Sequence, residues 1–367
     1  MSIPTEFPVN HPSARKRWGK DLAVETLKSQ YWSKFMGSGE DDIIKIQNEL
    51  KNKAGDKITV ELVRKLSGDG VEGDSTLEGS QAEEGLDFFH DAVFVDQRRK
   101  STLNKGKMSD QRVPHDIRLK GRSALKTWWS EDYDEQIMMY LAGARGIDPS
   151  YKVALDWTGR AGNPLTPPDR LIYGGDASGK ADLDASDIMH LSMLERLVAF
   201  AETTDPMIRP VKIQGEKKYI LLVHTFQAYQ LRTGTSENDW LEIQKATGER
   251  GKKNKVYHNA LGEYADCIMH KHRNVVRFSD YGAGGDLPAA RALFLGAHAG
   301  IIAWAKNGNI NRMNWYEEEV DRGNALAIAA SAIYGTKRTV YTDKEGANPI
   351  DYGVIAVDTY CKDPNTI

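Results

Sequence analysis

Residues 55–107 read GDKITVELVRKLSGDGVEGDSTLEGSQAEEGLDFFHDAVFVDQRRKSTLNKGK, and this stretch decides the architecture of the chain. Ile58, Val60 and Leu62 alternate with polar residues, which is the period of a half-buried strand. A second apolar run covers 88–95, after a middle that is rich in Gly and acidic residues. The pattern predicts two strands joined by a flexible tip. A lone two-stranded ribbon is marginally stable in water, so we expect it to lie against its own domain or another copy.

The charge changes sign along this stretch. No Lys or Arg occurs from Ser67 to Asp91, and a basic block follows at once. The acidic residues of the first part are Asp69, Glu72, Asp74, Glu78, Glu83, Glu84, Asp87 and Asp91. The basic residues that follow are Arg98, Arg99, Lys100, Lys105, Lys107 and Arg112. The ribbon therefore carries an acidic tip.

The bulk composition is that of a soluble globular protein. The 367 residues are 40% hydrophobic, which is enough for real cores, and the net charge of −3 excludes a basic coat that neutralises nucleic acid by itself. The two cysteines, Cys267 and Cys361, fit a reducing compartment better than a disulfide framework. The polar, Pro-containing start is not a signal peptide, and no apolar run is long enough for a membrane span. We expect synthesis and folding in the cytosol.

Helical spacing marks two parts of the first 143 residues. Apolar residues from Leu22 to Phe35 predict an amphipathic helix that Gly37 ends, and 42–52 is a candidate for a second, short helix. The longest pattern runs over 116–143, with Asp116 as N-cap, and predicts a rod of roughly 40 Å. The basic segment at 14–20 contains a Trp and is a candidate for nucleic-acid binding, although a solvated helix face is favoured.

The rest of the chain mixes helices and strands, which indicates an α+β protein rather than a doubly wound sheet. The predicted helices are 186–200, 239–246 and 288–306, the last being rich in Ala and Gly. The predicted strands are 170–173, within a loop-rich segment at 148–184, then 218–225, 315–320, 337–342 and 352–357. Residues 325–333 fit either period, and a strand is favoured there.

These residues carry a resemblance to a known family. The sequence resembles the major capsid proteins of N4-like tailed phages, which share the Hong-Kong-97-type coat fold. The matching stretches are WGKDLAVETLKSQYWSKFMG (18–37), GDKITVELVRKLSGDGVEGDSTLEG (55–79), VDQRRKS (95–101), ALKTWWSE (124–131), NALGEYADCIMHKHRNVVRF (259–278) and RALFLGAHAGIIAWAK (291–306). They run in family order over nearly the whole chain.

The resemblance implies a division into five parts. Residues 1–54 resemble the N-terminal arm with its amphipathic helix, and 55–115 resemble the extended β-ribbon loop that lies across the adjacent subunit. Residues 116–185 resemble the spine helix of the peripheral domain and its connection. Residues 186–310 are expected to be mostly axial domain with an interleaved peripheral strand at 218–226, and 311–367 to return to the peripheral domain.

The implied function is that of a coat protein that assembles as hexamers and pentamers into an icosahedral shell around double-stranded DNA. Laying the acidic tip on a basic neighbouring surface would relieve its self-repulsion, in contacts that are individually weak, about 0–1 kcal/mol for an exposed ion pair. The expected contact residues at the tip are Asp69, Glu72, Asp74, Leu77, Glu78, Glu83 and Glu84. Their expected partners, at the root of the ribbon of the next subunit, are Arg98, Arg99, Lys100, Lys105 and Arg112.

The resemblance also implies partners. About fifty residues precede the ribbon, which leaves no room for a fused scaffolding domain, so a separate scaffolding protein is expected, along with a portal and a candidate decoration protein. Contact with DNA is expected to be non-specific, on the inner surface. The candidate residues for it are Arg15, Lys16, Arg17 and Lys20. No Lys occurs between Lys65 and Lys100, so crosslinking through a tip lysine is not expected. The mature location is the virion, after assembly in the bacterial cytoplasm.

Two other classes of function remain as alternatives. One is a cellular nanocompartment shell of the same fold, and the other is a cytosolic enzyme that binds a metal or phosphate. The acidic tip lacks the spacing of an EF-hand, and Gly282, Gly284 and Gly285 lack that of a phosphate-binding loop. His270 and His272 could bind Zn²⁺, with His258 nearby, but nothing completes a ligand set. We therefore expect no catalytic residue, no metal and no cofactor.

Overall fold

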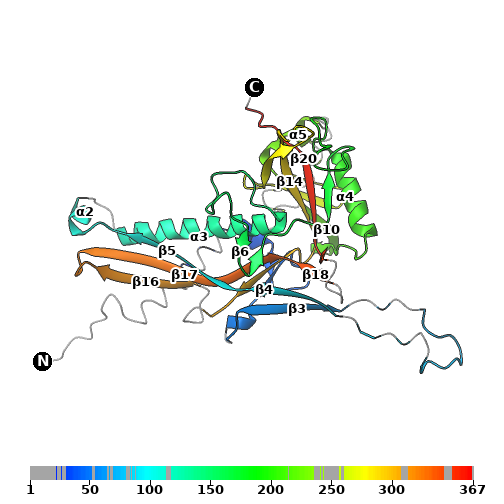
Figure 1. The fold of residues 1–367 in the computed structure, drawn as a ribbon, viewed down its shortest axis with the longest axis horizontal. Helices are drawn as coiled ribbons and strands as arrows, with labels where there is room; N and C mark the ends of the chain where they lie inside the picture. Colours follow the sequence, from blue (N-terminus) through cyan, green and yellow to red (C-terminus); the bar gives the residue numbers. More distant parts are fainter. Residues whose placement is uncertain are drawn as a thin grey trace.

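The protein has an elongated limb, a lobe beside it and a ribbon that projects beyond both (Figure 1). The computed structural model describes residues 22, 26, 30–51, 54–63, 66, 69–79, 83, 85–86, 88–112, 117–213, 215–234, 240, 243, 256–257, 260–306, 313–342 and 349–365. The fold is of the α+β class, as the sequence predicted.

The limb is a helix laid along a long sheet. Its central strand is β17 (Ala325–Arg338), which pairs with β5 (Asp96–Leu103) at one edge. The other edge pairs with β16 (Met313–Val320) and, further along, with β15 (Gly300–Trp304). Next to β15 lie β2 (Ile44–Gln47) and β1 (Met36–Gly37). The strand predicted at 325–333 is thus confirmed and is the longest in the described parts of the chain.

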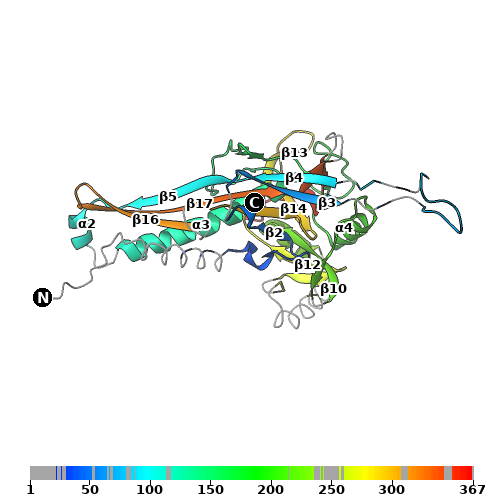
Figure 2. The ribbon, with the colours of Figure 1, turned by 90° about the horizontal axis from the view of Figure 1, so that it is seen from below.

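The spine helix α3 (Ile117–Ala142) covers this sheet because its apolar residues recur every four positions (Figure 2). Leu125, Trp129, Tyr133, Ile137 and Leu141 are all buried on one face of the helix. The helix ends where Gly143 adopts φ +66°, and a side chain there would collide with the Thr166 carbonyl oxygen. The predicted helix is confirmed, whereas its predicted cap, Asp116, lies outside the described residues.

The lobe is built on an eight-stranded sheet with two helices. Its main strand order is β11–β12–β10–β14–β20–β8, with β9 beside β10 and β13 beside β14. The strands are β8 (Leu171–Tyr173), β9 (Val211–Ile213), β10 (Glu216–Val223), β11 (Gly262–Tyr264), β12 (Cys267–Lys271), β13 (Arg277–Tyr281), β14 (Leu287–Leu295) and β20 (Val354–Tyr360). The helices α4 (Leu191–Thr203) and α5 (Thr225–Thr233) share a buried cluster with this sheet. The strands predicted at 170–173 and 218–225 are therefore confirmed.

The prediction of a helix at 288–306 is wrong. The segment forms the two strands β14 and β15, with a turn at His298, where φ is +55°. β14 lies between β10 and β20 and is buried from Ala289 to Leu295, so the run is apolar on both faces. A run of this kind looks alike in sequence whether it is a buried strand or a buried helix, and the neighbouring strands decide between them.

The short helix proposed for 42–52 is also wrong, because Ile44 and Ile46 lie in β2, which pairs in parallel with both β1 and β15. A 3-10 turn (Glu49–Lys51) follows it. Of the predicted N-terminal helix, Leu22 and Thr26 are helical and Trp32–Lys34 form a 3-10 turn, whereas Gln30, Tyr31 and Phe35 are not helical. The residues at 23–25 and 27–29 lie outside the described part of the chain. The helix predicted at 239–246 is described only at Trp240 and Ile243, both helical.

Three strands pair with partners from other parts of the chain than their own expected part. Residues 218–223, expected to belong to the peripheral domain, lie in the middle of the lobe sheet as β10. The C-terminal strand β20 also joins the lobe, by pairing with β14 along seven residues. Conversely, β15 pairs with β17 and belongs to the limb. Pairing partners that are distant in sequence fix these assignments, and no local pattern reports them.

A buried ion pair joins the limb to the lobe. Arg291 donates to both carboxylate oxygens of Asp358, over 2.7 and 2.6 Å, and also to the carbonyl oxygen of Ala142 at the end of α3 (2.9 Å). Tyr281 donates its hydroxyl to the same carboxylate, over 2.5 Å. Sheet and spine helix therefore share one charged group that water does not reach.

We predict that Asp358→Asn destabilises the unassembled chain by about 3–5 kcal/mol, because it leaves the buried Arg291 charge unpaired. Asp280→Asn is the matched control, since Asp280 pairs with Lys180 at the surface, where a pair contributes about 0–1 kcal/mol. Urea unfolding measures both. Equal, small effects for the two variants would contradict a joining role for Asp358.

Candidate functional site

The projecting ribbon is anchored at one end only. Strand β3 (Lys57–Val63) pairs antiparallel with β4 (Phe88–Phe94), from Lys57 opposite Phe94 to Val63 opposite Phe88. At its root, β4 contacts β18 (Val340–Thr342), which in turn pairs with β19 (Pro349–Asp351). Beyond Val63 and Phe88 the chain extends away from the rest of the molecule (Figures 1 and 2). We call 57–94 the ribbon and 64–87 the ribbon tip.

Two ion pairs fix the root of the ribbon. Asp91 in β4 is buried, pairs with Lys337 and accepts a hydrogen bond from the Val340 backbone (3.1 Å). One residue further along, Arg338 pairs with the fully buried Asp351 over 2.7 Å. Both cations lie at the end of β17, so the direction of the ribbon is set by the central strand of the limb. Their roles have no signal in the sequence, because the partners come from separate segments.

The described part of the ribbon tip exposes its acidic side chains. Asp69, Glu72, Asp74, Glu78 and Glu83 are all exposed, and Glu84 lies outside the described residues. The turns at Gly70, Gly73 and Gly79 have positive φ, and a side chain at any of the three would meet nothing within 4 Å. The tip therefore presents its charge to solvent or to another molecule.

Large apolar side chains are exposed along the same ribbon. Their exposed fractions are Val63 52%, Leu66 57%, Leu77 54%, Leu86 61% and Phe88 42%. Single exposed apolar residues are ordinary, but a series on one projecting element marks a surface that another molecule covers. The ribbon thus combines acidic charge with apolar area.

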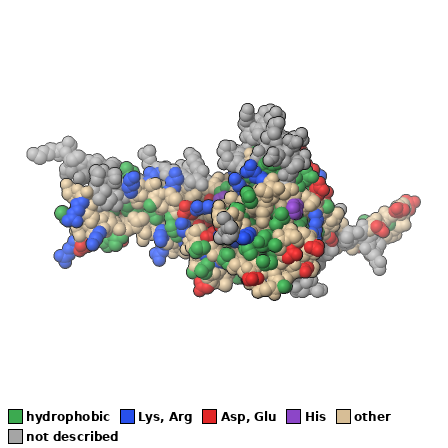
Figure 3. All heavy atoms as spheres, turned by 90° about the horizontal axis from the view of Figure 1, so that it is seen from above, with side chains coloured by type: hydrophobic (Ala, Val, Ile, Leu, Met, Phe, Trp, Pro, Cys, Tyr) green, Lys and Arg blue, Asp and Glu red, His purple; other side chains and the backbone are tan. Residues whose placement is uncertain are grey.

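The expected basic partners begin beside the root of the ribbon, with Arg98 and Arg99 in β5, and continue away from it. β5 runs antiparallel to β17, from Asp96 opposite Tyr334 to Leu103 opposite Ala327, and carries the basic block along the limb towards α2 (Lys107–Gln111). Lys105, Lys107 and Arg112 therefore lie at the opposite end of the molecule from the acidic ribbon tip (Figures 1 and 3). One tip can reach these basic residues only on another copy.

The basic residues are not equivalent. Arg98 is held by Asp132 of α3, over 2.5 Å, and its guanidinium lies 5.2 Å from the Trp128 ring. It stabilises the limb of its own chain. Lys100 lies over the same ring, at 5.3 Å. The exposed members of the block are Arg99, Lys100, Lys105, Lys107 and Arg112.

Buried acids of α3 form a second group that the sequence pattern did not single out. Asp134 accepts backbone hydrogen bonds from Tyr31 (2.8 Å) and Trp32 (3.3 Å), which attaches the N-terminal segment to the spine helix. Burial raises the pKa of Asp134 from 3.8 to about 7. Burial likewise raises the pKa of Glu135, which accepts from the Lys152 backbone, to about 7.

The residues that suggested a metal or phosphate site have other surroundings. Burial lowers the pKa of His270 to about 3 and of His272 to about 4, and their rings pack on Phe35 and Tyr31. Gly282 and Gly285 form the turn between β13 and β14. His258 and the four N-terminal candidates Arg15, Lys16, Arg17 and Lys20 lie outside the described residues.

Metal-ligating clusters and membrane-spanning helices were the two remaining possibilities for the described residues. Within them, no group of three or more His, Cys, Asp or Glu side chains is placed to hold a metal ion. None of the helices in that part of the chain is both long and apolar enough to span a membrane.

The chain combines a projecting ribbon, a spine helix on a long sheet and a separate lobe. This architecture is that of a subunit of a larger assembly. The chain belongs to the phage capsid protein family, whose model matches residues 6–363. It is a structural protein of the virion, a phage major capsid protein, and not an enzyme. Family membership also favours a phage shell over a cellular nanocompartment.

Known relatives agree over nearly the whole length. The chain is 26% identical to the major capsid protein of Pseudomonas phage KPP25, in a match that covers 93% of each protein. Its structure is similar to the capsid of Ralstonia phage GP4, with a TM-score of 0.85, 38% identity and complete coverage of both chains. The capsid of cyanophage Pam1 has the same fold, with a TM-score of 0.70 at 18% identity over 98% of this chain and 99% of that one.

We predict that Asp134→Asn reduces the pH dependence of stability. Because the folded state binds a proton at Asp134 between about pH 4 and 7 and the unfolded state does not, its contribution is complete below about pH 4 and is lost as pH rises through about 7. The loss of Tm between about pH 5 and pH 8 should therefore be smaller in the variant. Asp176→Asn, a change of an exposed acid outside α3, should keep the full loss.

Proposed function

We propose that the subunits form rings of six and five, in which the ribbon tip of one subunit lies on the limb of the next. The single observation that supports this most is the separation of charge and apolar surface along the molecule: an acidic ribbon tip at one end and exposed basic residues at the other. A contact between two different surfaces of the same chain is head-to-tail, and such contacts give closed rings when the rotation between copies closes.

The chemistry of the tip suits a reversible contact. Exposed ion pairs contribute about 0–1 kcal/mol each, so a subunit that is placed wrongly can dissociate. Covering Leu77 and Phe88 on a neighbour removes apolar surface from water and contributes about 25 cal/mol per Å². Shell stability then comes from repetition over many subunits, as part of a virion.

The proposed division of the chain follows the sheets. The arm (1–54), ribbon loop (55–115) and spine segment (116–185) keep the boundaries expected from sequence. Between 186 and 367, strands that pair within the eight-stranded sheet form the axial domain, and those that pair with β17 form the peripheral domain. The N4-like subtype within the family is part of this proposal, and it rests on the stretches quoted above.

The remaining partners are also proposed. A separate scaffolding protein would direct closure of the shell, which would be assembled in the host cytoplasm with a portal at one vertex and a decoration protein outside. Double-stranded DNA would lie against the inner surface without sequence preference, contacted by Arg15, Lys16, Arg17 and Lys20.

We predict that reversing charge at the ribbon tip, with Asp69, Glu72 and Asp74 all changed to Lys, blocks shell formation and leaves the unassembled chain folded and soluble. These side chains are exposed in the single chain, so the change acts on contacts between copies. Negative-stain electron microscopy and light-scattering mass measure the outcome.

The control for this variant changes Asp156, Asp176 and Glu202 to Lys, which alters the net charge equally at exposed positions away from the ribbon. It should assemble. If the tip variant formed normal shells, the proposed contact between the ribbon tip and the next subunit would be contradicted.

We predict that changing Arg15, Lys16, Arg17 and Lys20 to Gln weakens DNA binding by the unassembled chain for all sequences alike. The slope of log K against log salt concentration is negative, and each lost phosphate contact makes it less steep by about 0.9. Fluorescence anisotropy over a salt series measures this slope. The same change at Arg99, Lys105, Arg112 and Lys120 should leave it unaltered, and the opposite ranking would place DNA on the limb.

A further inference from the structure

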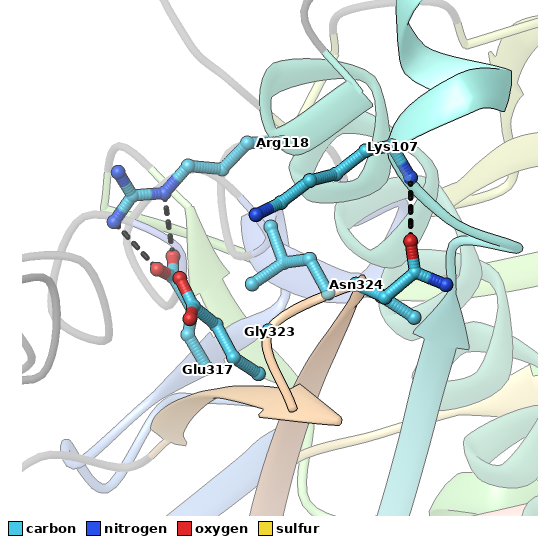
Figure 4. Close-up of a pocket in the computed structure, with 8 residues that line it drawn as sticks. Lys107, Arg118, Glu317, Gly323 and Asn324 are labelled. Carbon is cyan, nitrogen blue, oxygen red and sulfur yellow. Dashed lines mark hydrogen bonds and ion pairs between the residues drawn. The ribbon is translucent and has the colours of Figure 1, made fainter. Parts of the chain in front are cut away.

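The free end of the limb contains a hollow (Figure 4). It lies between the start of α2, the first turn of α3 and the turn from β16 to β17, and its volume is about 270 Å³. This is below the usual size of a small-molecule pocket, about 300–1,000 Å³, so the hollow fits a side chain rather than a cofactor. We call it the limb-end hollow.

One wall of the limb-end hollow is rigid. Arg118 donates from Nε to one carboxylate oxygen of Glu317 over 2.8 Å and forms an ion pair with the other oxygen through Nη2, at 2.6 Å. Trp315 donates its indole N–H to the same carboxylate, over 2.7 Å, and Glu317 is buried. This buried acid is therefore already neutralised, and the wall is shaped before anything binds.

The other wall offers a cation above an apolar floor. The Lys107 backbone N–H donates to the Asn324 side chain, over 3.4 Å, while its ammonium extends into the hollow (Figure 4). That ammonium has no ion pair or hydrogen bond with any residue that the structure describes. Leu326 lines the floor and packs against the main core. Glu319 is exposed at the rim, where water and salt screen its charge.

We infer that the limb-end hollow receives Leu77 and Glu78 from the ribbon tip of a second copy of this chain. Leu77 is 54% exposed and is followed directly by an exposed acid, so the pair matches the apolar floor and the Lys107 ammonium. The tip and the hollow lie at opposite ends of one molecule, which makes the contact intermolecular (Figure 3). The inference rests on the proposed ring contact and specifies the point of attachment.

Disulfide trapping tests the attachment directly. In shells of Glu78→Cys combined with Lys107→Cys, mild oxidation should give covalent oligomers up to the size of a ring on a non-reducing gel. Both native cysteines are buried, so the background is low. The control combines Glu78→Cys with Lys180→Cys, an exposed lysine of the lobe, and should remain monomeric. Absence of oligomers from the first pair in closed shells would overturn the inference.

Charge exchange gives a second, independent test. Lys107→Glu should lower the yield of shells at least tenfold, and adding Glu78→Lys should restore at least half of it. Lys120→Glu, a change of an exposed lysine of α3 that does not line the hollow, should lower the yield less than twofold. Normal assembly of Lys107→Glu overturns the hollow alone if the tip triple variant still fails to assemble. If both variants assemble, the proposed ring contact fails as well.

Discussion

The packing of the helix α3 on the strand β17 positions the other elements of the limb. The rings of Tyr133 in α3 and Tyr334 in β17 meet edge to face, with centroids 4.8 Å apart, and Trp304 of β15 lies 5.5 Å from each. All three side chains are buried. Aromatic pairs in this geometry contribute about 0.5–1.5 kcal/mol beyond the area they bury. Because β17 also pairs with β5, β15 and β16, this contact sets the position of the whole limb sheet against its helix.

The charges of the molecule follow two different rules. Inside, each strongly buried acid has a cation or backbone donors: Asp132 has Arg98, Asp351 has Arg338, and Asp134 has the amides of the N-terminal segment. On the outside, the acidic ribbon tip is separated from the basic residues of the limb end, where the exposed acids Glu318 and Glu319 also lie. The net charge of −3 conceals this separation. The buried ion pairs stabilise the single subunit. The surface charges, in contrast, are available for contacts between subunits.

The comparison with known capsids shows which features the architecture requires. At 18% identity, the Pam1 capsid retains the fold over almost the whole chain. An architecture that survives with so few shared residues depends on patterns, namely a long amphipathic helix, alternating strands and turns, rather than on particular side chains. Contacts made by single side chains, such as those at the limb-end hollow, are where members of one fold can differ.

The sequence by itself determined the elements whose signals are local. The alternation at 58–62 specified β3, the spacing from Leu125 to Leu141 specified α3, and the acids from Asp69 to Glu83 specified an exposed tip. The tertiary structure alone decided the rest. Residues 288–306 became strands because β10, β20 and β17 supply their hydrogen bonds, and the basic block extends from the ribbon root along the limb because β5 pairs with β17. Arg98 and Arg99 look alike in sequence, yet Arg98 pairs inside the limb, since only folding brings Asp132 to it. Local patterns report which face of an element is apolar, whereas pairing between distant segments depends on the whole chain.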